Sequence, residues 1–300
     1  MGTPDFAVEP LRVLVEDGYN IVAVITMPDK PAGRGHKVQF SPVKQYALQA
    51  GLPILQPEKL KDPDFIEQLR TYNADLQIVV AFRMLPEIVW SMPRLGTFNL
   101  HASLLPQYRG AAPINWAIIN GDKQTGITTF FLKHEIDTGD MIMQQAISIG
   151  EDENVGSVHD RLMELGGQLV KKTVDLILTG EVTTRPQPES NDLRPAPKIF
   201  RETCQINFNR NVREVHNFVR GLSPYPAAWA ALNLTGEEQV YKIYETRPIV
   251  MEHNLTIGSI VTDHKTYIRI ACSDGFIELL TIQMAGKKSM PVRDFLNGLR

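Results

Sequence analysis

The first half of the chain alternates short, continuously apolar segments with amphipathic helical patterns. Residues 20–26 and 76–81 are rich in β-branched residues and carry no charge. Strands that are apolar on both faces are typical of a parallel sheet with helices on both sides. The first half is therefore predicted to be an α/β domain. We expect its helices at about 5–17, 43–50, 63–72, 111–120 and 155–179, and further strands at about 127–132 and 141–149.

A proline-rich segment separates this half from a second pattern. Residues 181–198 contain four prolines among polar residues, which predicts an extended linker without a core of its own. Several short strands at regular spacing follow and predict a small β-barrel. The strand patterns lie near 227–234, 239–245, 257–262, 266–272 and 276–282, with helices near 210–221 and 291–298. We therefore predict a domain at 1–182, a linker at 183–197 and a C-terminal domain at 198–300.

Composition narrows the class of protein. A chain of 300 residues with 43% hydrophobic and 22% charged residues is typical of a soluble protein with two domains. Cys204 and Cys272 give neither a disulfide framework nor zinc spacing, which favours a reducing cytoplasm. No apolar run approaches the roughly 20 residues of a membrane span. Residues 1–197 have a net charge of −6 and residues 198–300 a net charge of +3, so the second part better suits an anionic partner.

Three polar residues with period-two spacing follow one another in the first half: Asn99, His101 and Ser103. In a strand, these side chains leave the same face, which brings an amide, an imidazole and a hydroxyl together. An amide donor can stabilise an oxyanion, and an imidazole can move a proton near neutral pH. Asp137, on a neighbouring loop, adds the carboxylate of an acid–base site that needs no metal. The alternative interpretation is a polar strand end held by ordinary hydrogen bonds.

An irregular insertion at residues 28–37 carries the cations Lys30, Arg34 and Lys37 together with two glycines. Long loops that follow strands of α/β proteins often bind ligands. A mobile basic loop is suited to phosphates or nucleic acid, although a solvated flexible loop is the simpler alternative.

Several motifs resemble the folate-dependent formyltransferase superfamily. Asn-x-His-x-Ser-Leu-Leu-Pro at 99–106, followed by Asp-Thr-Gly at 137–139, resembles its signature. Other motifs resemble the methionyl-tRNA formyltransferases within it, namely Gly-Thr-Pro-Asp-Phe at 2–6, Asp-Lys-Pro-Ala-Gly-Arg-Gly at 29–35, Ser-Pro-Val-Lys at 41–44 and Arg-Gly-Ala-Ala-Pro-Ile at 109–114. The likeness covers nearly the whole chain. It implies a Rossmann-like catalytic domain followed by an OB-type barrel that helps to hold tRNA.

The same resemblance implies a role for each matching residue. It assigns Asn99 to the formyl carbonyl oxygen and His101 to proton transfer as the methionyl amine attacks 10-formyltetrahydrofolate. It assigns Asp137 to orienting and charging that site. The matching folate-binding stretch is Ser103, Leu104, Leu105 and Pro106, and the matching tRNA-binding loop carries Lys30, Arg34 and Lys37. The implied partners are methionyl-initiator tRNA and the folate co-substrate, with no metal, no membrane and no protein partner.

This chain departs from the family pattern in two places. Relatives have Ala-Tyr-Gly-x-x-Leu-Pro where residues 81–86 read Ala-Phe-Arg-Met-Leu-Pro, which leaves the folate contacts of that loop open. Relatives also have an apolar strand before Gly-Thr-Pro, and in a doubly wound sheet that strand is central. We therefore expect a gap or an unpaired edge beside residues 20–26 and 76–81. Either the chain is unstable or aggregation-prone, or Met1 is an internal methionine of a longer protein, which we favour.

Two other functions stay open. A formyltransferase or hydrolase of the same superfamily can act on a small molecule such as a purine precursor, an amino sugar or formyltetrahydrofolate itself. Purine-type enzymes usually carry a histidine seven residues before the aspartate, where this chain has Phe130. A non-catalytic nucleic-acid-binding module is the second alternative, but such a module has no use for Asn99, His101 and Asp137. The favoured prediction is formyl transfer to methionyl-initiator tRNA.

Overall fold

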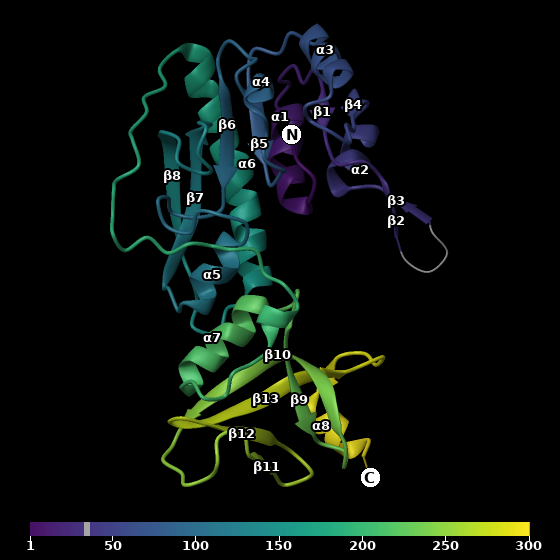
Figure 1. The fold of residues 1–300 in the computed structure, drawn as a ribbon, viewed down its shortest axis with the longest axis vertical. Helices are drawn as coiled ribbons and strands as arrows, with labels where there is room; N and C mark the ends of the chain where they lie inside the picture. The colour runs from purple at the N-terminus through teal and green to yellow at the C-terminus, as the bar shows by residue number, and fades with distance from the viewer. Residues whose placement is uncertain (33–36, 300) are drawn as a thin grey trace. The chain divides into compact units, whose positions relative to one another are not determined.

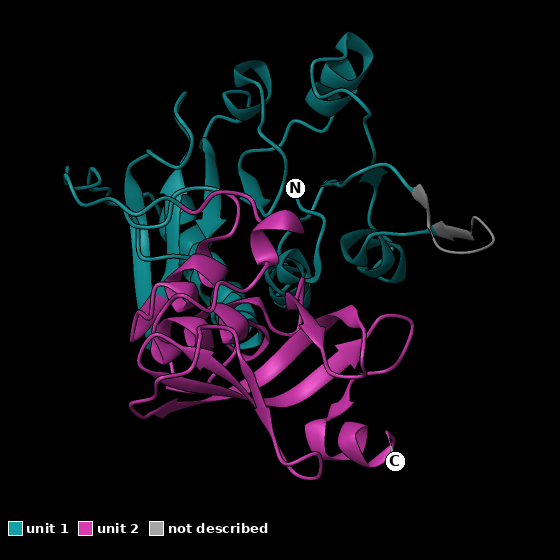
Figure 2. Ribbon diagram, turned by 60° about the horizontal axis from the view of Figure 1, so that its bottom comes forward, with its two compact units in different colours: residues 1–110, 126–147, 159–195 teal, residues 111–125, 148–158, 196–300 magenta. Residues whose placement is uncertain are grey.

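The computed structural model describes residues 1–32 and 37–299, which form two compact units (Figure 2). Unit 1 comprises Met1–Gly110, Gly126–Ile147 and His159–Pro195, and unit 2 comprises Ala111–Thr125, Ser148–Val158 and Ala196–Arg300. The chain leaves unit 1 for the last time inside the segment predicted to be the linker. The domain bounds drawn from the sequence stay a prediction.

The main sheet of unit 1 has four strands in the order β5, β6, β7 and β8 (Figure 1). The strands span Gln77–Val80, Thr97–His101, Gln124–Phe131 and Met141–Ser148. β5 and β6 run parallel, whereas β6 and β7 run antiparallel. Two short strands, β1 (Val24–Ile25) and β4 (Ile54–Leu55), form a separate parallel pair. This arrangement confirms the predicted α/β fold.

The long helix α6 (Val155–Thr179) packs on the sheet and on α1 (Val8–Glu16) within unit 1. Gly166 and Gly167 permit the close approach. A Cβ on Gly166 would lie 2.8 Å from Leu100 Cδ2 of β6, and a Cβ on Gly167 would lie 3.0 Å from side-chain atoms of α1. A glycine inside a helix costs about 0.5–1 kcal/mol relative to alanine, and this packing explains why two are present.

The remaining elements of unit 1 are short. They are η1 (Asp5–Ala7), β2 (Lys30–Ala32), β3 (Lys37–Gln39), α2 (Pro42–Gln49), α3 (Pro63–Thr71) and α4 (Glu87–Trp90). The predicted helices over 5–17, 43–50 and 63–72 agree with η1–α1, α2 and α3 to within one residue. The prediction of an irregular insertion at 28–37 is wrong for residues 30–32 and 37, because β2 and β3 pair as antiparallel strands.

A gap separates β1 from β5, as the sequence predicted. The first two residues lie in it (Figure 1): Gly2 N donates to Ile25 O at 3.0 Å, and Val80 N donates to Met1 O at 2.9 Å. A cavity of about 440 Å³ continues between the strands and is lined mainly by apolar residues of α1, β1 and β5. The predicted strand at 20–26 therefore shrinks to the two residues of β1, because among the described residues its cavity-facing edge has no partner strand.

Unit 2 is built on an antiparallel sheet in the order β11, β12, β13, β10 and β9, with β14 beside β13. The strands span Ile260–Thr262, Ile268–Cys272, Gly275–Met284, Glu238–Val250, Ala228–Asn233 and Met290–Pro291. β10 is longer than predicted because it pairs with β9 and then with β13, with an irregular register at Glu245 that lets it bend. The helical elements η2 (Glu202–Cys204), α7 (Val212–Leu222) and α8 (Val292–Asn297) complete this half-barrel, which agrees with the OB-type expectation.

Two segments that precede the predicted linker belong to unit 2. α5 (Pro113–Ile119) packs on α7 so closely that a Cβ on Gly221 would lie 2.6 Å from Ile119 Cγ1. The guanidinium of Arg220, which is 6% exposed, donates to backbone carbonyls of residues 148–158. Unit 2 thus extends beyond the predicted C-terminal domain, because a buried cation and close helix packing hold these segments.

Buried His216 predicts that unit 2 is sensitive to acid. Its Nδ1 lies 3.1 Å from Thr246 Oγ1, and its Nε2 lies 3.1 Å from Asp152 Oδ1 but outside hydrogen-bonding geometry. Burial lowers the pKa of His216, although Asp152 opposes this. The unfolded chain, with a histidine pKa of about 6.5, therefore binds more protons than the folded one below that pH.

We expect the free energy of unfolding to fall as the pH drops below about 6.5. In His216→Gln the free energy of unfolding should differ less between about pH 7.5 and pH 5.5 than in the wild-type protein, because this titrating group is gone. Urea unfolding of both proteins at the two pH values measures this difference. If the free energy of unfolding falls equally in both proteins, the acid sensitivity comes from groups other than His216.

Candidate active site

β6 carries two of the predicted catalytic residues. Asn99 and His101 leave the same face of this strand, which is hydrogen-bonded to β5 on one side and to β7 on the other. Asn99 Oδ1 is buried and has no hydrogen-bond partner in the described part of the chain. Leaving a buried acceptor unpaired is unfavourable, so this atom marks a place where a donor of a ligand can bind.

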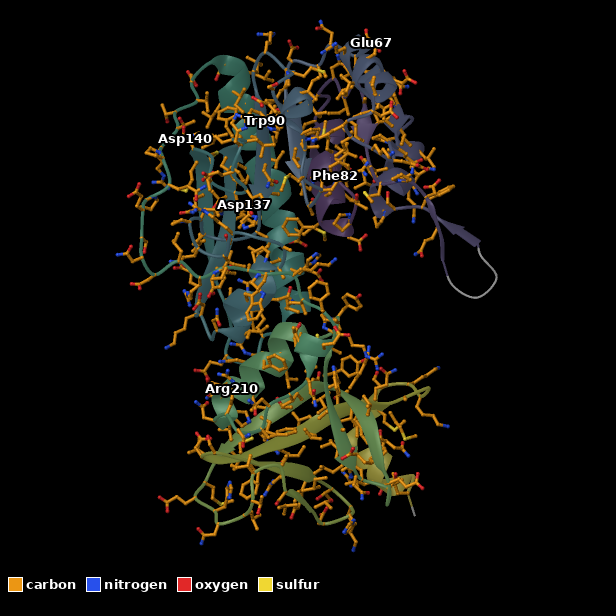
Figure 3. All side chains as sticks on the ribbon, in the orientation of Figure 1. Glu67, Phe82, Trp90, Asp137, Asp140 and Arg210 are labelled. Carbon is orange, nitrogen blue, oxygen red and sulfur yellow. The ribbon has the colours of Figure 1, made fainter. Side chains whose placement is uncertain are left out.

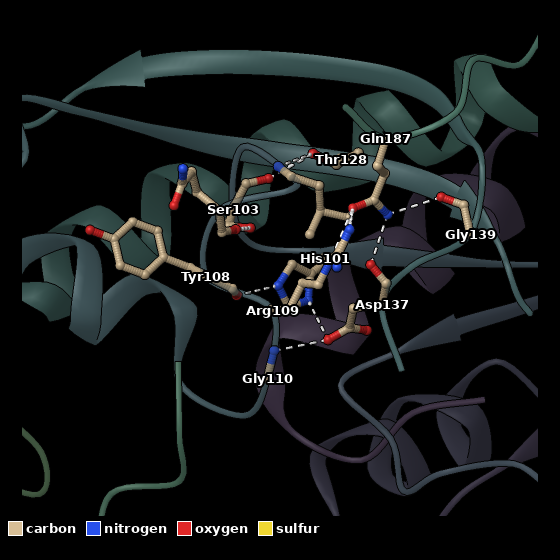
Figure 4. Close-up of polar contacts among 11 residues, drawn as sticks. His101, Ser103, Tyr108, Arg109, Gly110, Thr128, Asp137, Gly139 and Gln187 are labelled. Carbon is tan, nitrogen blue, oxygen red and sulfur yellow. Dashed lines mark hydrogen bonds and ion pairs between the residues drawn. The ribbon is translucent and has the colours of Figure 1, made fainter. Parts of the chain in front are cut away.

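His101 is the last residue of β6 and is 6% exposed. Its Nε2 lies 2.8 Å from the carbonyl oxygen of Tyr108 (Figure 4). Because a carbonyl oxygen only accepts, Nε2 must carry the proton, and Nδ1 of the neutral ring is then an acceptor. Nδ1 lies 3.9 Å from Asp137 Oδ2. This arrangement leaves Nδ1 as the atom that can accept a proton, with a carboxylate near enough to pair with a charged ring.

Asp137 lies on the loop that follows β7 (Figure 3). Its φ of +55° is in the left-handed region, and its Oδ2 accepts a hydrogen bond from Gly110 N at 2.9 Å. Two residues further on, Gly139 has no room for a side chain, because a Cβ there would lie 1.6 Å from Phe131 O. The Asp-Thr-Gly sequence is thus explained by the close approach of this loop to the end of β7.

The loop formed by residues 108–110 joins His101 to Asp137. Tyr108, with a φ of +59°, accepts from His101 through its carbonyl oxygen. Gly110 donates to the carboxylate of Asp137 through its backbone N–H. Both contacts use backbone atoms, so no side-chain pattern in the sequence could have indicated them.

Gln187 is a site residue that the sequence interpretation missed. It lies in the predicted linker, and its side chain contacts Arg109 and the loop that carries Asp137 (Figure 4). The flanking Pro186 and Pro188, which favour an extended backbone, were the available signal.

The predicted folate-binding stretch forms the turn after β6. Ser103 is fully buried, and its hydroxyl donates to Gln107 O at 2.6 Å, so this hydroxyl serves the turn itself. Leu105 is also buried, against residues of β7 and β8. Leu104 and Pro106 keep part of their surface exposed. Folate binding by this stretch stays a prediction.

Two of the three predicted tRNA-binding residues belong to the paired strands β2 and β3. Lys30 and Lys37 lie on these two strands, and Arg34 lies outside the described residues. An ion pair between Lys44 of α2 and Asp29 fixes the chain just before β2. The contacts of these cations with tRNA stay a prediction.

Other kinds of site find little support in the described residues. Within 1–32 and 37–299, no three His, Cys, Asp or Glu residues form a group that could hold a metal ion. Both cysteines are buried, and burial raises the pKa of Cys272 to about 11, so it is a thiol at neutral pH. Of the helices that the structure describes, none has the length and apolar character that crossing a membrane requires.

Comparison with known families matches both halves of the chain. Residues 1–174 match the family described as formyl transferase, and residues 198–300 match the formyl transferase C-terminal domain. The chain belongs to the formyltransferase family. The methionyl-tRNA formyltransferase of Bacteroides fragilis (strain ATCC 25285) is 65% identical to this formyltransferase. The match covers 99% of this chain and 93% of the relative. That of Flavobacterium psychrophilum is 53% identical over 100% of this chain and 95% of the relative.

Solved structures share the fold of this formyltransferase. A sugar 3N-formyltransferase, WlaRD, solved with dTDP and 5-N-formyl-THF, has a TM-score of 0.66 at 20% identity and covers 96% of this chain and 97% of its own. An N-formyltransferase from Helicobacter canadensis, in complex with folinic acid and dTDP-3-aminofucose, has a TM-score of 0.66 at 19% identity, covering 93% and 96%. At these identities the likeness supports the fold alone.

Proposed function

We propose that this formyltransferase transfers the formyl group of 10-formyltetrahydrofolate to the amino group of methionyl-initiator tRNA. The observation that carries the proposal is the 53–65% identity, over essentially the whole chain, to proteins named methionyl-tRNA formyltransferase. A substrate of translation initiation implies that the reaction takes place in the cytoplasm.

The first step needs a base and an oxyanion donor. As the methionyl amine attacks the formyl carbon, His101 Nδ1 takes a proton from the amine, and Asp137 stabilises the imidazolium from 3.9 Å. The amide nitrogen of Asn99 donates to the carbonyl oxygen as it becomes an oxyanion. The buried Asn99 Oδ1 supplies an acceptor for a remaining N–H of the amine.

The second step breaks the bond between the formyl carbon and N10 of the folate. An amide-like nitrogen leaves poorly as an anion, so it needs a proton as the bond breaks. His101 returns to N10 the proton that it took from the amine, and the ring is neutral again. The products are tetrahydrofolate and formylmethionyl-tRNA, and no proton is left over.

A competition assay tests the proposed acceptor. The purified protein is incubated with 10-formyltetrahydrofolate and either charged initiator tRNA, glycinamide ribonucleotide or a dTDP-amino sugar. We expect formyl transfer to methionyl-tRNA only. Turnover with a small-molecule acceptor, without turnover of methionyl-tRNA, would contradict the proposal.

A separate variant tests the role of the basic segment at residues 28–37. We expect Arg34→Ala to lower kcat/KM for tRNA while the KM for folate stays unchanged. The slope of log KM against log salt should fall by about 1, as it does when one phosphate contact is lost. Lys61→Ala, on an exposed loop of the same unit, is the matched control. Unchanged tRNA kinetics in Arg34→Ala would remove this loop from recognition.

A further inference from the structure

All the hydrogen-bonding groups of the half-buried Gln187 side chain are used at the candidate active site (Figure 4). Its Nε2 donates to Asp137 O at 2.7 Å and to Gly139 O at 2.9 Å. Its Oε1 accepts from Arg109 Nε at 3.1 Å and from Arg109 Nη2 at 2.6 Å. One neutral side chain thus joins two loops that are far apart in the sequence.

These two loops set the position of Asp137 relative to His101. Residues 108–110 contact His101 through a carbonyl oxygen and Asp137 through a backbone N–H. Tyr108 and Asp137 both have positive φ, which non-glycine residues adopt only when their surroundings hold them there. Gln187 is such a restraint, since its side chain binds the guanidinium of Arg109 on one side and the backbone of the Asp137 loop on the other.

We propose that Gln187 is a positioning residue for formyl transfer, and this inference rests on the proposed roles of His101 and Asp137. It ties the Asp137 loop to the side chain of Arg109, so that the carboxylate faces His101 Nδ1. The separation of 3.9 Å suits an ion pair but not a hydrogen bond, and no direct bond keeps the two groups in place. Their relative position therefore depends on the restraints around them.

The first test is Gln187→Leu, which keeps a side chain of similar size and removes the hydrogen bonds. We expect kcat to fall by about 10- to 100-fold, since misplacing a reacting group by 1 Å can have this effect. The KM values for methionyl-tRNA and folate should stay within about twofold, because the lost interaction acts in the transition state. A kcat within about twofold of the wild-type value would overturn the inference.

Gln187→Glu distinguishes the hydrogen bonds that Gln187 accepts from Arg109 from those that it donates to the Asp137 loop. A carboxylate still accepts from Arg109, but it cannot donate to the carbonyl oxygens of Asp137 and Gly139 and it repels them. We expect kcat to fall as in Gln187→Leu, with the protein folded. Wild-type kcat in this variant would show that the donors to the Asp137 loop are not needed.

A double-mutant cycle shows whether Gln187 acts through Asp137. In an Asp137→Asn background, Gln187→Leu should lower kcat no further, because the group that it positions has lost its charge. A merely structural residue would lower the rate by the same factor in both backgrounds. Equal factors would therefore overturn the inference.

Gln107→Leu is the matched control. Gln107 also binds the extended segment, through Asp192 O at 3.3 Å and Arg194 N at 2.9 Å, but its side chain does not contact the Asp137 loop. We expect wild-type kcat in this variant. Wild-type protein that does not formylate methionyl-tRNA would defeat the proposed function. Active wild-type protein and impaired Asp137→Asn, together with unimpaired Gln187→Leu, would defeat only the positioning role.

Discussion

Alanine in place of His101 should lower kcat for formyl transfer by about 100-fold or more, and alanine in place of Asn99 should have an effect of similar size. The first variant loses the group that is proposed to take the amine proton and return it to N10. The second loses the amide that is proposed to donate to the oxyanion. Both variants lose interactions that mainly stabilise the transition state, so the KM values should change much less than kcat.

Single-turnover formylation of charged initiator tRNA measures this effect, with circular dichroism to show that each variant is folded. His134→Ala is the control, because its side chain is 73% exposed and contacts Glu87 at 3.3 Å rather than the site. The control should keep wild-type kcat. Near-normal transfer by both the His101 and the Asn99 variants would show that the catalytic assignment is wrong.

A five-residue extension of alternating valine and isoleucine, fused ahead of Met1, should raise the Tm of unit 1 by about 5 °C or more. The cavity between β1 and β5 has the form of a slot for one strand, since Gly2 already bridges to Val80 in parallel register. The amine of Met1 donates to Ile78 O at 2.7 Å there, and burial lowers its pKa to about 5. A fused residue replaces this desolvated amine by a neutral amide that can join the ladder.

The size of this effect follows from opposing terms. Each buried valine or isoleucine contributes about 1.5–3 kcal/mol, and ordering its backbone opposes this by about 1–2 kcal/mol. A net gain of a few kcal/mol corresponds to a Tm rise of about 2–4 °C per kcal/mol for a domain of this size. A Gly-Ser extension of equal length is the control, because it fills the slot poorly. Equal Tm values for the two fusions would show that the cavity does not accept a strand.

Local sequence determined most of the secondary structure. α6 forms over the predicted residues 155–179, because its apolar residues recur on one stripe and need no distant partner to be recognised. The apolar segment at 76–81 likewise contains β5. The gap beside β5 was also predictable, since Gly-Thr-Pro is typical of a turn that follows a strand. β1 is shorter than its apolar pattern, because a strand also needs a neighbour with which to pair.

At the candidate site, the sequence determined which residue types stand together on one strand. The period-two spacing of Asn99 and His101 is enough to place both on one face of β6. The Asp-Thr-Gly motif indicated Asp137, but spacing alone could not give its distance from His101. The hydroxyl of Ser103 looked equally available, and only the folded turn shows that it bonds to Gln107 O.

Tertiary structure alone decided how the candidate site is held and where unit 2 begins. The proton on His101 Nε2 is fixed by a carbonyl oxygen, a group that every residue carries and that therefore leaves no sequence signal. Gln187 reaches Asp137 from 50 residues away, and Arg220 reaches Gly150 from 70 residues away. Such contacts depend on the path of the whole chain, whereas periodicity reports only on neighbours along it.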